Sequence, residues 1–228
     1  MSKIYAVSVK KGGAGKTATT KNLAAAFSKL GKSVLVVDLD CQHYLSNLQG
    51  FEPDGKGTLT NMIVEYISGI EVNFEEYIRY HEEEKVSYIP CNETLAAVEG
   101  FLAQDGLGNK TLSNIFKNPL FEKFEYILFD CPTNVDGLLV SNAYKAADKL
   151  IIPVQAEPEC YEGVPGTIQK MMLIKQNDNL PDIIEGFIVT MYRNTLTNRK
   201  VTEALKESYG DLVFTSYIPR LEEAVRPG

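Results

Sequence analysis

The sequence has few cysteines and no cysteine pair: the four residues, at positions 41, 91, 131 and 160, are scattered singly among 228 residues. Without Cys-x-x-Cys spacing, neither a zinc site nor a disulfide framework is expected, and such thiols are typical of a reducing compartment. The sequence also lacks an apolar run of membrane-spanning length, and its N-terminus leads directly into a predicted strand. These absences predict a soluble, cytoplasmic protein.

The sequence is also not basic overall, because 30 acidic residues outnumber 23 basic ones and give a formal net charge of −7. This balance argues against a globally basic nucleic-acid-binding protein, so any contact with DNA must come from a local patch. No linker, repeat or low-complexity segment divides the chain, and its length fits one α/β domain with a substantial core. We therefore expect a single domain over residues 1–228.

The most informative segment that is present is glycine-rich and covers residues 10–17, Lys-Lys-Gly-Gly-Ala-Gly-Lys-Thr. It lies between an apolar strand pattern at 4–9 and a helical pattern, which is the setting of a phosphate-binding loop. Glycines permit backbone conformations in which successive N–H groups converge on phosphate oxygens, and the following helix N-terminus adds positive potential. The pattern predicts that Lys16 contacts the β- and γ-phosphates of a nucleotide and that Thr17 ligates Mg²⁺.

The loop is a variant of the ordinary pattern G-x-x-x-x-G-K-[ST], because Lys10 takes the place of the first glycine. It resembles the loop K-G-G-x-G-K-[ST] of the ParA/MinD family of deviant Walker A ATPases, and the resemblance runs over nearly the whole chain. The resemblance implies that Lys11 is the signature lysine, which reaches the ATP of the facing subunit in a nucleotide-sandwich dimer. It further implies that the residues contacting ATP are Lys11, Gly12, Gly13, Ala14, Gly15, Lys16, Thr17 and Ala18.

Two further apolar strand patterns, at 34–37 and 124–129, are each followed by a carboxylate. Runs of this kind are typical of strands buried on both faces of a parallel sheet, and ligands bind at the carboxyl ends of such strands. The segments resemble the family's D-x-D-P-Q and D-x-P-P motifs. By that resemblance Asp38 and Asp130 support the magnesium ion through water, with Thr17 as its direct ligand, and Asp40 positions the attacking water. The catalytic residues expected on this basis are Lys11, Lys16 and Asp40.

Three positions depart from the family pattern. Cys41 takes the place of a usual proline, Ala18 that of a common second hydroxyl, and Thr133 that of a common second proline. None of these changes removes a charged group from the expected chemistry. They bear instead on the rate of hydrolysis and on the stiffness of the loop that contains Thr133.

Strand and helix patterns alternate along the remaining sequence, which favours an α/β fold with a doubly wound, mostly parallel sheet and helices on both faces. We expect the acidic residues 82–84 to form a solvated helix face. The predicted helices cover residues 58–69, 73–84, 93–104, 110–120, 137–147 and 161–176. The predicted strands cover residues 86–89, 149–154, 183–190 and 212–218.

The C-terminal part carries two further candidate sites. Residues 217–220 resemble the family's adenine-holding loop, which implies that Pro219 and Arg220 contact the base, with Met191 as a second wall. A local basic cluster is a candidate DNA-binding surface, although solvated surface charges are the alternative interpretation. The cluster consists of Arg193, Arg199, Lys200, Arg220 and Arg226.

The resemblance is greatest to small, Soj-like ParA proteins. It implies a homodimer with ATP and Mg²⁺ that binds DNA nonspecifically, associates with the nucleoid, and segregates plasmid or chromosomal DNA with a ParB-like partner that stimulates hydrolysis. One alternative is a MinD-like or other cargo-positioning ATPase. However, the sequence has no C-terminal amphipathic helix for a membrane, and we expect no membrane partner. Another alternative is a nucleotide-gated scaffold with little turnover. Relatives usually continue into a further helix beyond the point at which this sequence ends.

Overall fold

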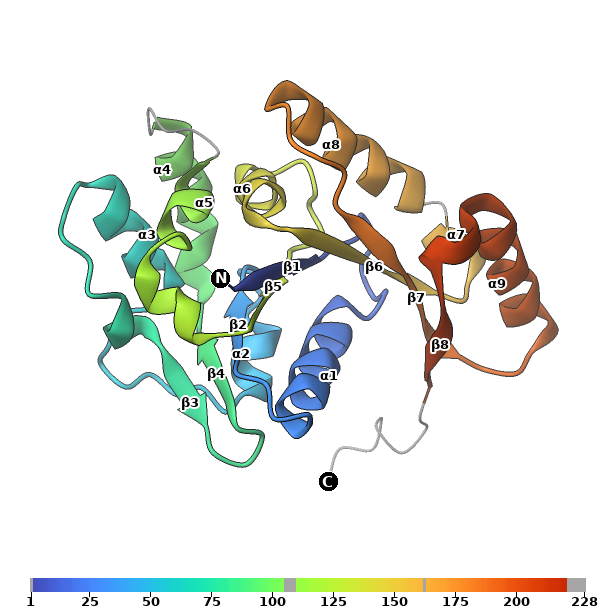
Figure 1. Cartoon of the computed structure of the whole chain (residues 1–228), viewed down its shortest axis with the longest axis horizontal. Helices are drawn as coiled ribbons and strands as arrows, with labels where there is room; N and C mark the ends of the chain where they lie inside the picture. The colour runs from blue at the N-terminus through green and yellow to red at the C-terminus, as the bar shows by residue number, and fades with distance from the viewer. Residues whose placement is uncertain (1, 105–109, 162, 221–228) are drawn as a thin grey trace.

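The computed structural model describes residues 2–104, 110–161 and 163–220, which form an eight-stranded sheet with helices on both faces (Figure 1). The strand order is β3-β4-β2-β5-β1-β6-β7-β8, and all neighbouring strands are parallel except β3 and β4. The strands are β1 (Lys3–Val7), β2 (Val34–Asp38), β3 (Arg79–His81), β4 (Val86–Ile89), β5 (Tyr126–Asp130), β6 (Lys149–Gln155), β7 (Ile184–Tyr192) and β8 (Val213–Pro219). This architecture confirms the predicted fold class.

Helices cover the two faces unequally: α1 and α2 lie on one side of the sheet, and α3 to α6 and α8 lie on the other (Figure 1). The α-helices are α1 (Lys16–Lys29), α2 (Tyr44–Leu48), α3 (Leu59–Ile67), α4 (Val98–Gln104), α5 (Thr111–Ile115), α6 (Leu138–Ala146), α7 (Pro158–Tyr161), α8 (Gly163–Asn177) and α9 (Leu196–Tyr209). Short 3₁₀ helices are η1 (Phe74–Tyr77), η2 (Glu93–Ala97), η4 (Pro119–Lys123) and η5 (Gly210–Leu212). None of the helices within the described residues is long and apolar enough to cross a bilayer.

The hydrophobic core is divided by the sheet into two clusters. Alternate residues of β1 face opposite sides, so Tyr5 and Val7 pack towards α1 while Ile4 and Ala6 pack towards the larger group of helices. The larger cluster includes the fully buried Tyr144. The central strands are therefore covered on both faces and hold their carboxyl ends in fixed positions.

The predicted helix at 73–84 is wrong. Phe74–Tyr77 forms a single 3₁₀ turn, β3 then pairs antiparallel with β4 as an edge strand, and the acidic residues 82–84 lie in the turn between them. The Arg79 side chain anchors this segment, since its guanidinium donates to both carboxylate oxygens of Asp54 at 2.8 and 2.9 Å. Tertiary pairing thus overrides the helical propensity of the glutamates.

Other predicted boundaries differ in smaller ways. The helix predicted at 110–120 ends at Ile115, because the following turn is capped by Asn118, whose side chain accepts from the Leu120 N–H at 3.0 Å, with Pro119 in the first position. Sequence analysis missed α2 and α9. The α9 segment has few apolar residues, and only Asn198 and Leu205 of it are buried.

Candidate functional site

The glycine-rich loop connects the central strand β1 to α1 at the carboxyl edge of the sheet. Gly13 and Gly15 have φ angles of 74° and 83°, in the left-handed region that disfavours side chains. Ala14 is fully buried, and its carbonyl accepts a hydrogen bond of 2.8 Å from the Thr190 hydroxyl on β7. The hydrogen bond from Thr190 therefore fixes the loop to the sheet. This arrangement fits the predicted role of Gly12, Gly13, Ala14 and Gly15, whose backbone N–H groups would bind phosphate.

Lys16 opens α1 and is buried, with 7% of its surface exposed. Its ammonium donates to the Lys11 carbonyl at 3.1 Å and to the Thr133 hydroxyl at 2.9 Å. Burial lowers the pKa of Lys16, while the carboxylates of Asp130 and Asp40 act in the opposite direction. The structure thus holds a lysine side chain between the glycine-rich loop and the ends of two neighbouring strands.

Asp38 and Asp130 lie side by side, because they are register partners at the ends of the parallel strands β2 and β5. Each is 1% exposed. Burial raises the pKa of both carboxyl groups, and the adjacent Asp38 also contributes to raising the pKa of Asp130 to about 8. Two neighbouring buried carboxylates need a compensating positive charge, and Lys16 supplies only one.

The hydrogen bonds of these two carboxylates differ. Asp38 Oδ2 accepts from the Ser46 N–H at 2.8 Å and from the Ser46 hydroxyl at 2.7 Å. Asp130 accepts from the Thr20 hydroxyl at 3.3 Å through Oδ1, and a hydrogen bond from the Thr17 side chain also stabilises its charged form. Its Oδ2 is buried without a partner among the described residues. A buried carboxylate oxygen in this state, beside a threonine hydroxyl, fits a nearby hydrated cation.

The donor set fits Mg²⁺ better than a metal that requires a cage of protein ligands. Within residues 2–104, 110–161 and 163–220, no group of three or more His, Cys, Asp or Glu side chains is placed to hold a metal ion. Mg²⁺ keeps several waters and usually binds through one or two protein oxygens together with substrate phosphates. Thr17, in the first turn of α1, together with Asp38 and Asp130 at the ends of β2 and β5, would provide such a set.

Asp40 and Lys11 are partly buried, whereas Lys16, Asp38 and Asp130 are buried. The Asp40 N–H donates to Asp38 at 3.2 Å, and Asp40 Oδ1 accepts from the Gln42 N–H at 3.0 Å. Lys11 forms no ion pair with any described residue, whereas the neighbouring Lys10 pairs with Asp136 at 2.8 Å. The structure therefore gives the two consecutive lysines different surroundings.

Several residues of this site were missed by the sequence analysis. Thr190 and Ser46 support the loop and Asp38, and Thr133 contacts Lys16. On α8, the Thr167 hydroxyl accepts from the Lys10 N–H at 2.9 Å. Thr190, Ser46 and Thr167 lie far from their partners in the sequence and belong to no recognised motif, so the linear sequence contained no signal for them. Thr133 was noted only as a departure from the family pattern, and its contact with Lys16 was not predicted.

The residues proposed to hold adenine come together at the same edge of the sheet. Met191 follows Thr190 and has a φ of 50°, and Pro219 is the register partner of Tyr192. The Arg220 N–H donates to the Tyr192 carbonyl at 3.1 Å. This geometry brings the ends of β7 and β8 together next to Thr190, the β7 residue that contacts the phosphate loop.

The basic cluster is gathered around the start of α9. Arg193, Arg199, Lys200 and Arg220 are all exposed, and the Arg199 guanidinium donates to Asn194 at 2.9 Å. The remaining predicted member, Arg226, lies outside the described residues. The four described cations belong to the outer strands β7 and β8 and the helix between them.

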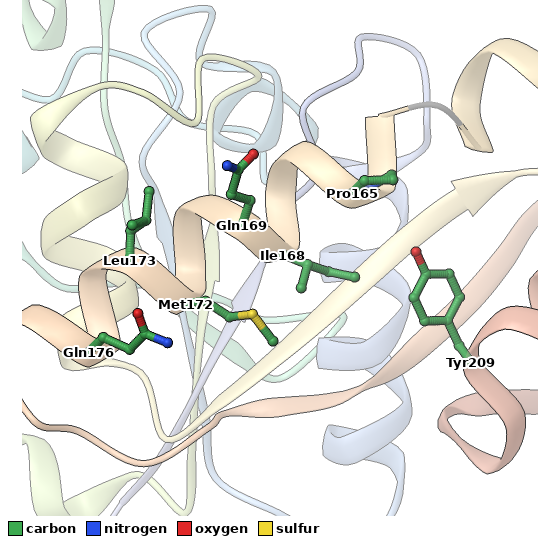
Figure 2. A pocket seen from close by; sticks show the side chains of 7 residues that line it. All are labelled: Pro165, Ile168, Gln169, Met172, Leu173, Gln176 and Tyr209. Carbon is green, nitrogen blue, oxygen red and sulfur yellow. The ribbon is translucent and has the colours of Figure 1, made fainter.

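A separate hollow of about 460 Å³ runs along the outer surface of α8. Figure 2 shows Ile168 and Met172 on α8, and Tyr209, from the end of α9, on the other side of the hollow. Its lining residues are Pro165, Ile168, Gln169, Met172, Leu173, Gln176 and Tyr209. None of them is charged, so this hollow is not the site of phosphate chemistry.

Comparisons with known proteins agree with the fold. A family model described as an AAA domain matches residues 2–183. The chain is 32% identical to the sporulation initiation inhibitor protein Soj of Bacillus subtilis, over 96% of this chain and 85% of Soj. It is 30% identical to the chromosome partitioning protein ParA of Myxococcus xanthus, over 96% of this chain and 75% of that protein.

Among solved structures, cobyrinic acid a,c-diamide synthase from Mycobacterium smegmatis, with a bound ATP analog and magnesium, has a TM-score of 0.86. It shares 27% identity, and the match covers 97% of this chain and 88% of that one. The fold and site define a P-loop nucleotide-binding protein. The chain belongs to the family of the AAA domain model, and within it to the ParA-type ATPases, which confirms the resemblance predicted from the sequence.

Proposed function

We propose that the protein is a partition ATPase that hydrolyses ATP with Mg²⁺, dimerises with ATP bound, and binds DNA without sequence preference. The observation that carries the proposal is the convergence, at one edge of the sheet, of the glycine-rich loop, Lys16, and the register-paired Asp38 and Asp130. Phosphoryl transfer requires mainly positioning and charge stabilisation, and these residues supply both.

The roles follow from position and charge. The loop amides and Lys16 would hold the phosphates, and Thr17 with Asp38 and Asp130 would hold Mg²⁺, which neutralises charge on the phosphate oxygens. Asp40, more exposed than Asp38, would orient the attacking water. Met191, Pro219 and Arg220 would contact the adenine from the neighbouring strand ends.

Dimerisation would place Lys11 against the nucleotide of the facing subunit. This assignment is supported by the absence of an ion pair for Lys11 within the described residues, in contrast to the pairing of Lys10 with Asp136. Because Lys11 forms no ion pair with the described residues of its own chain, it can contact a phosphate bound to the partner without breaking such a pair.

The basic cluster would contact DNA phosphates. Four exposed cations in one monomer provide only weak, salt-sensitive binding, whereas an ATP-bound dimer doubles their number and raises their effective concentration. Nucleotide state would thereby control association with the nucleoid. A ParB-like partner that stimulates hydrolysis would release the protein locally and move plasmid or chromosomal DNA.

A combined assay of ATP turnover and DNA binding tests the proposal. We expect measurable phosphate release with Mg²⁺ that is lost with a chelator, and retention of unrelated duplexes with ATP but not with ADP. Turnover without nucleotide-dependent DNA binding would exclude the partition function but keep the ATPase. Absence of both would exclude the proposal as a whole.

A further inference from the structure

The Lys16 ammonium has three N–H donors, and two of them have protein acceptors in the structure. One donates to the Lys11 carbonyl at 3.1 Å and one to the Thr133 hydroxyl at 2.9 Å. One donor is left for a ligand. A single additional acceptor, such as an oxygen of a β-phosphate, can therefore be added without breaking a protein contact.

The two protein acceptors differ in how firmly they are held. The Lys11 carbonyl belongs to the phosphate loop itself, and the peptide group just before it is held by a 2.8 Å hydrogen bond from the Lys11 N–H to the Val9 carbonyl. Thr133 instead lies in the exposed segment between β5 and α6. If Lys16 must exchange one acceptor, the contact with Thr133 is the easier one to lose.

The segment that contains Thr133, residues 131–137, is attached to the site at a second point. Asp136 pairs with Lys10 at 2.8 Å, and both side chains are at least half exposed, so this pair is weak. The Val135 N–H donates to the Thr133 carbonyl at 3.0 Å, which links the two contacts through a short turn. The segment is also held by the Cys131 N–H, which donates to the Val7 carbonyl at 3.2 Å, and by Lys170, which donates to the Asp136 carbonyl at 3.5 Å. Of the contacts made by the Thr133 and Asp136 side chains, the bond to Lys16 is the more buried one.

We propose that Thr133 is a positioning residue that distinguishes a triphosphate from a diphosphate. When ADP is bound, the Thr133 hydroxyl accepts a hydrogen bond from the Lys16 ammonium. When ATP is bound, Lys16 donates to the γ-phosphate instead and the bond to Thr133 is broken. This inference rests on the proposed function as an ATPase. It is specific to this chain, because proline, which is common at this position in the family, has no hydroxyl to exchange.

The test compares Thr133→Val, which removes the hydroxyl at nearly constant shape, with Thr133→Ser, which keeps it. Calorimetry would measure the affinities of the full chain for ADP and for AMPPNP, each with Mg²⁺. In Thr133→Val we expect ADP affinity within about twofold of wild type and AMPPNP affinity up to about tenfold tighter, because no bond to a charged group has to be broken. Thr133→Ser should match the wild type for both nucleotides.

Hydrogen exchange of residues 131–137 in the ADP-bound protein provides a second readout. We expect exchange in Thr133→Val to be about tenfold faster than in the wild type and in Thr133→Ser, the factor for one lost bond to a charged group. Weaker binding of both nucleotides by Thr133→Val would indicate a purely structural role. Selectively weaker AMPPNP binding would indicate direct contact with the γ-phosphate. Either result, or unchanged exchange, would overturn the proposal. A wild type that binds neither nucleotide would overturn the proposed function, and that result is visible without any variant.

Discussion

The central strands and the last two strands of the sheet end at the same edge but differ in construction. All five residues of β2 are buried and the strand ends in Asp38, whereas four of the seven residues of β8 are exposed and Arg220 follows it. Charges at the central strand ends act in a low-dielectric environment, while those of the basic cluster are screened by solvent and salt. We therefore propose that phosphoryl transfer takes place at the ends of the central strands and that the outer strands provide salt-dependent surface contacts.

The largest effect is expected from a substitution of Lys16, beside the ends of the central strands. Lys16→Ala should weaken MgATP binding by at least about 100-fold, because the loop amides would then face several phosphate charges without the buried ammonium. Calorimetry measures this loss. The control is Lys10→Ala, which removes only the exposed pair with Asp136 and should bind MgATP normally. Unchanged affinity in the Lys16 variant would contradict the phosphate-loop assignment.

Asp40 tests chemistry separately from binding. Asp40→Ala should reduce turnover by about 100-fold, the contribution typical of a group that handles the attacking water, while ATP affinity changes little. The variant should accumulate as a dimer with ATP, which light scattering detects. Wild-type turnover in this variant would remove Asp40 from the mechanism.

Lys11 tests whether the site is completed by a second subunit. Lys11→Ala should remain monomeric with ATP and hydrolyse it slowly, yet bind ADP within about threefold of the wild type, because its target lies on the facing subunit. Lys10→Ala again serves as the control and should dimerise. An ATP-bound dimer of normal strength in Lys11→Ala would refute the crossing lysine.

The outer strands should give smaller, salt-dependent effects. Arg199→Ala/Lys200→Ala should bind unrelated duplexes about tenfold more weakly at low salt, with a smaller difference at higher salt, and should keep wild-type ATP affinity. Lys206→Ala, in the last turn of α9, is the control. Equal DNA binding by the double variant and the wild type, measured by gel shift with ATP, would show that the cluster is only a solvated surface.

Two glycine substitutions should change stability without affecting either site. A Cβ at Gly186 in β7 would lie 2.6 Å from the Leu212 carbonyl oxygen, so Gly186→Ala should destabilise the fold by about 1–3 kcal/mol. At Gly100 in α4 a Cβ meets nothing within 4 Å, so Gly100→Ala should stabilise it by about 0.4–1 kcal/mol. Chemical denaturation measures both, and a stable Gly186→Ala would mean that β7 and β8 separate easily.

The same contrast explains how much the sequence could predict. The central strands appear in the sequence as short apolar runs ending in aspartate, because burial on both faces demands that composition. The phosphate loop is equally recognisable in the sequence, since Gly13 and Gly15 adopt positive φ angles that favour glycine. These local requirements are sufficient to place Lys16, Asp38 and Asp130 at the carboxyl edge of the sheet.

What the sequence could not predict depends on contacts between distant segments. The edge strand β3 replaces a predicted helix because Arg79 and Asp54 pair across the fold. α9 was missed because it buries little apolar surface. Thr133, just after β5, and Thr190, in β7, contact the loop, and this proximity is set only by the order of strands in the sheet.

The most direct test of the central claim is a calorimetric titration of the wild-type protein with ATP, in the presence of Mg²⁺ and then of a chelator. We predict saturable binding of one ATP per chain, and clearly weaker binding without Mg²⁺, because Thr17, Asp38 and Asp130 would lose the cation that links them to the phosphates. Absence of saturable binding, or binding of equal strength without Mg²⁺, would contradict this claim.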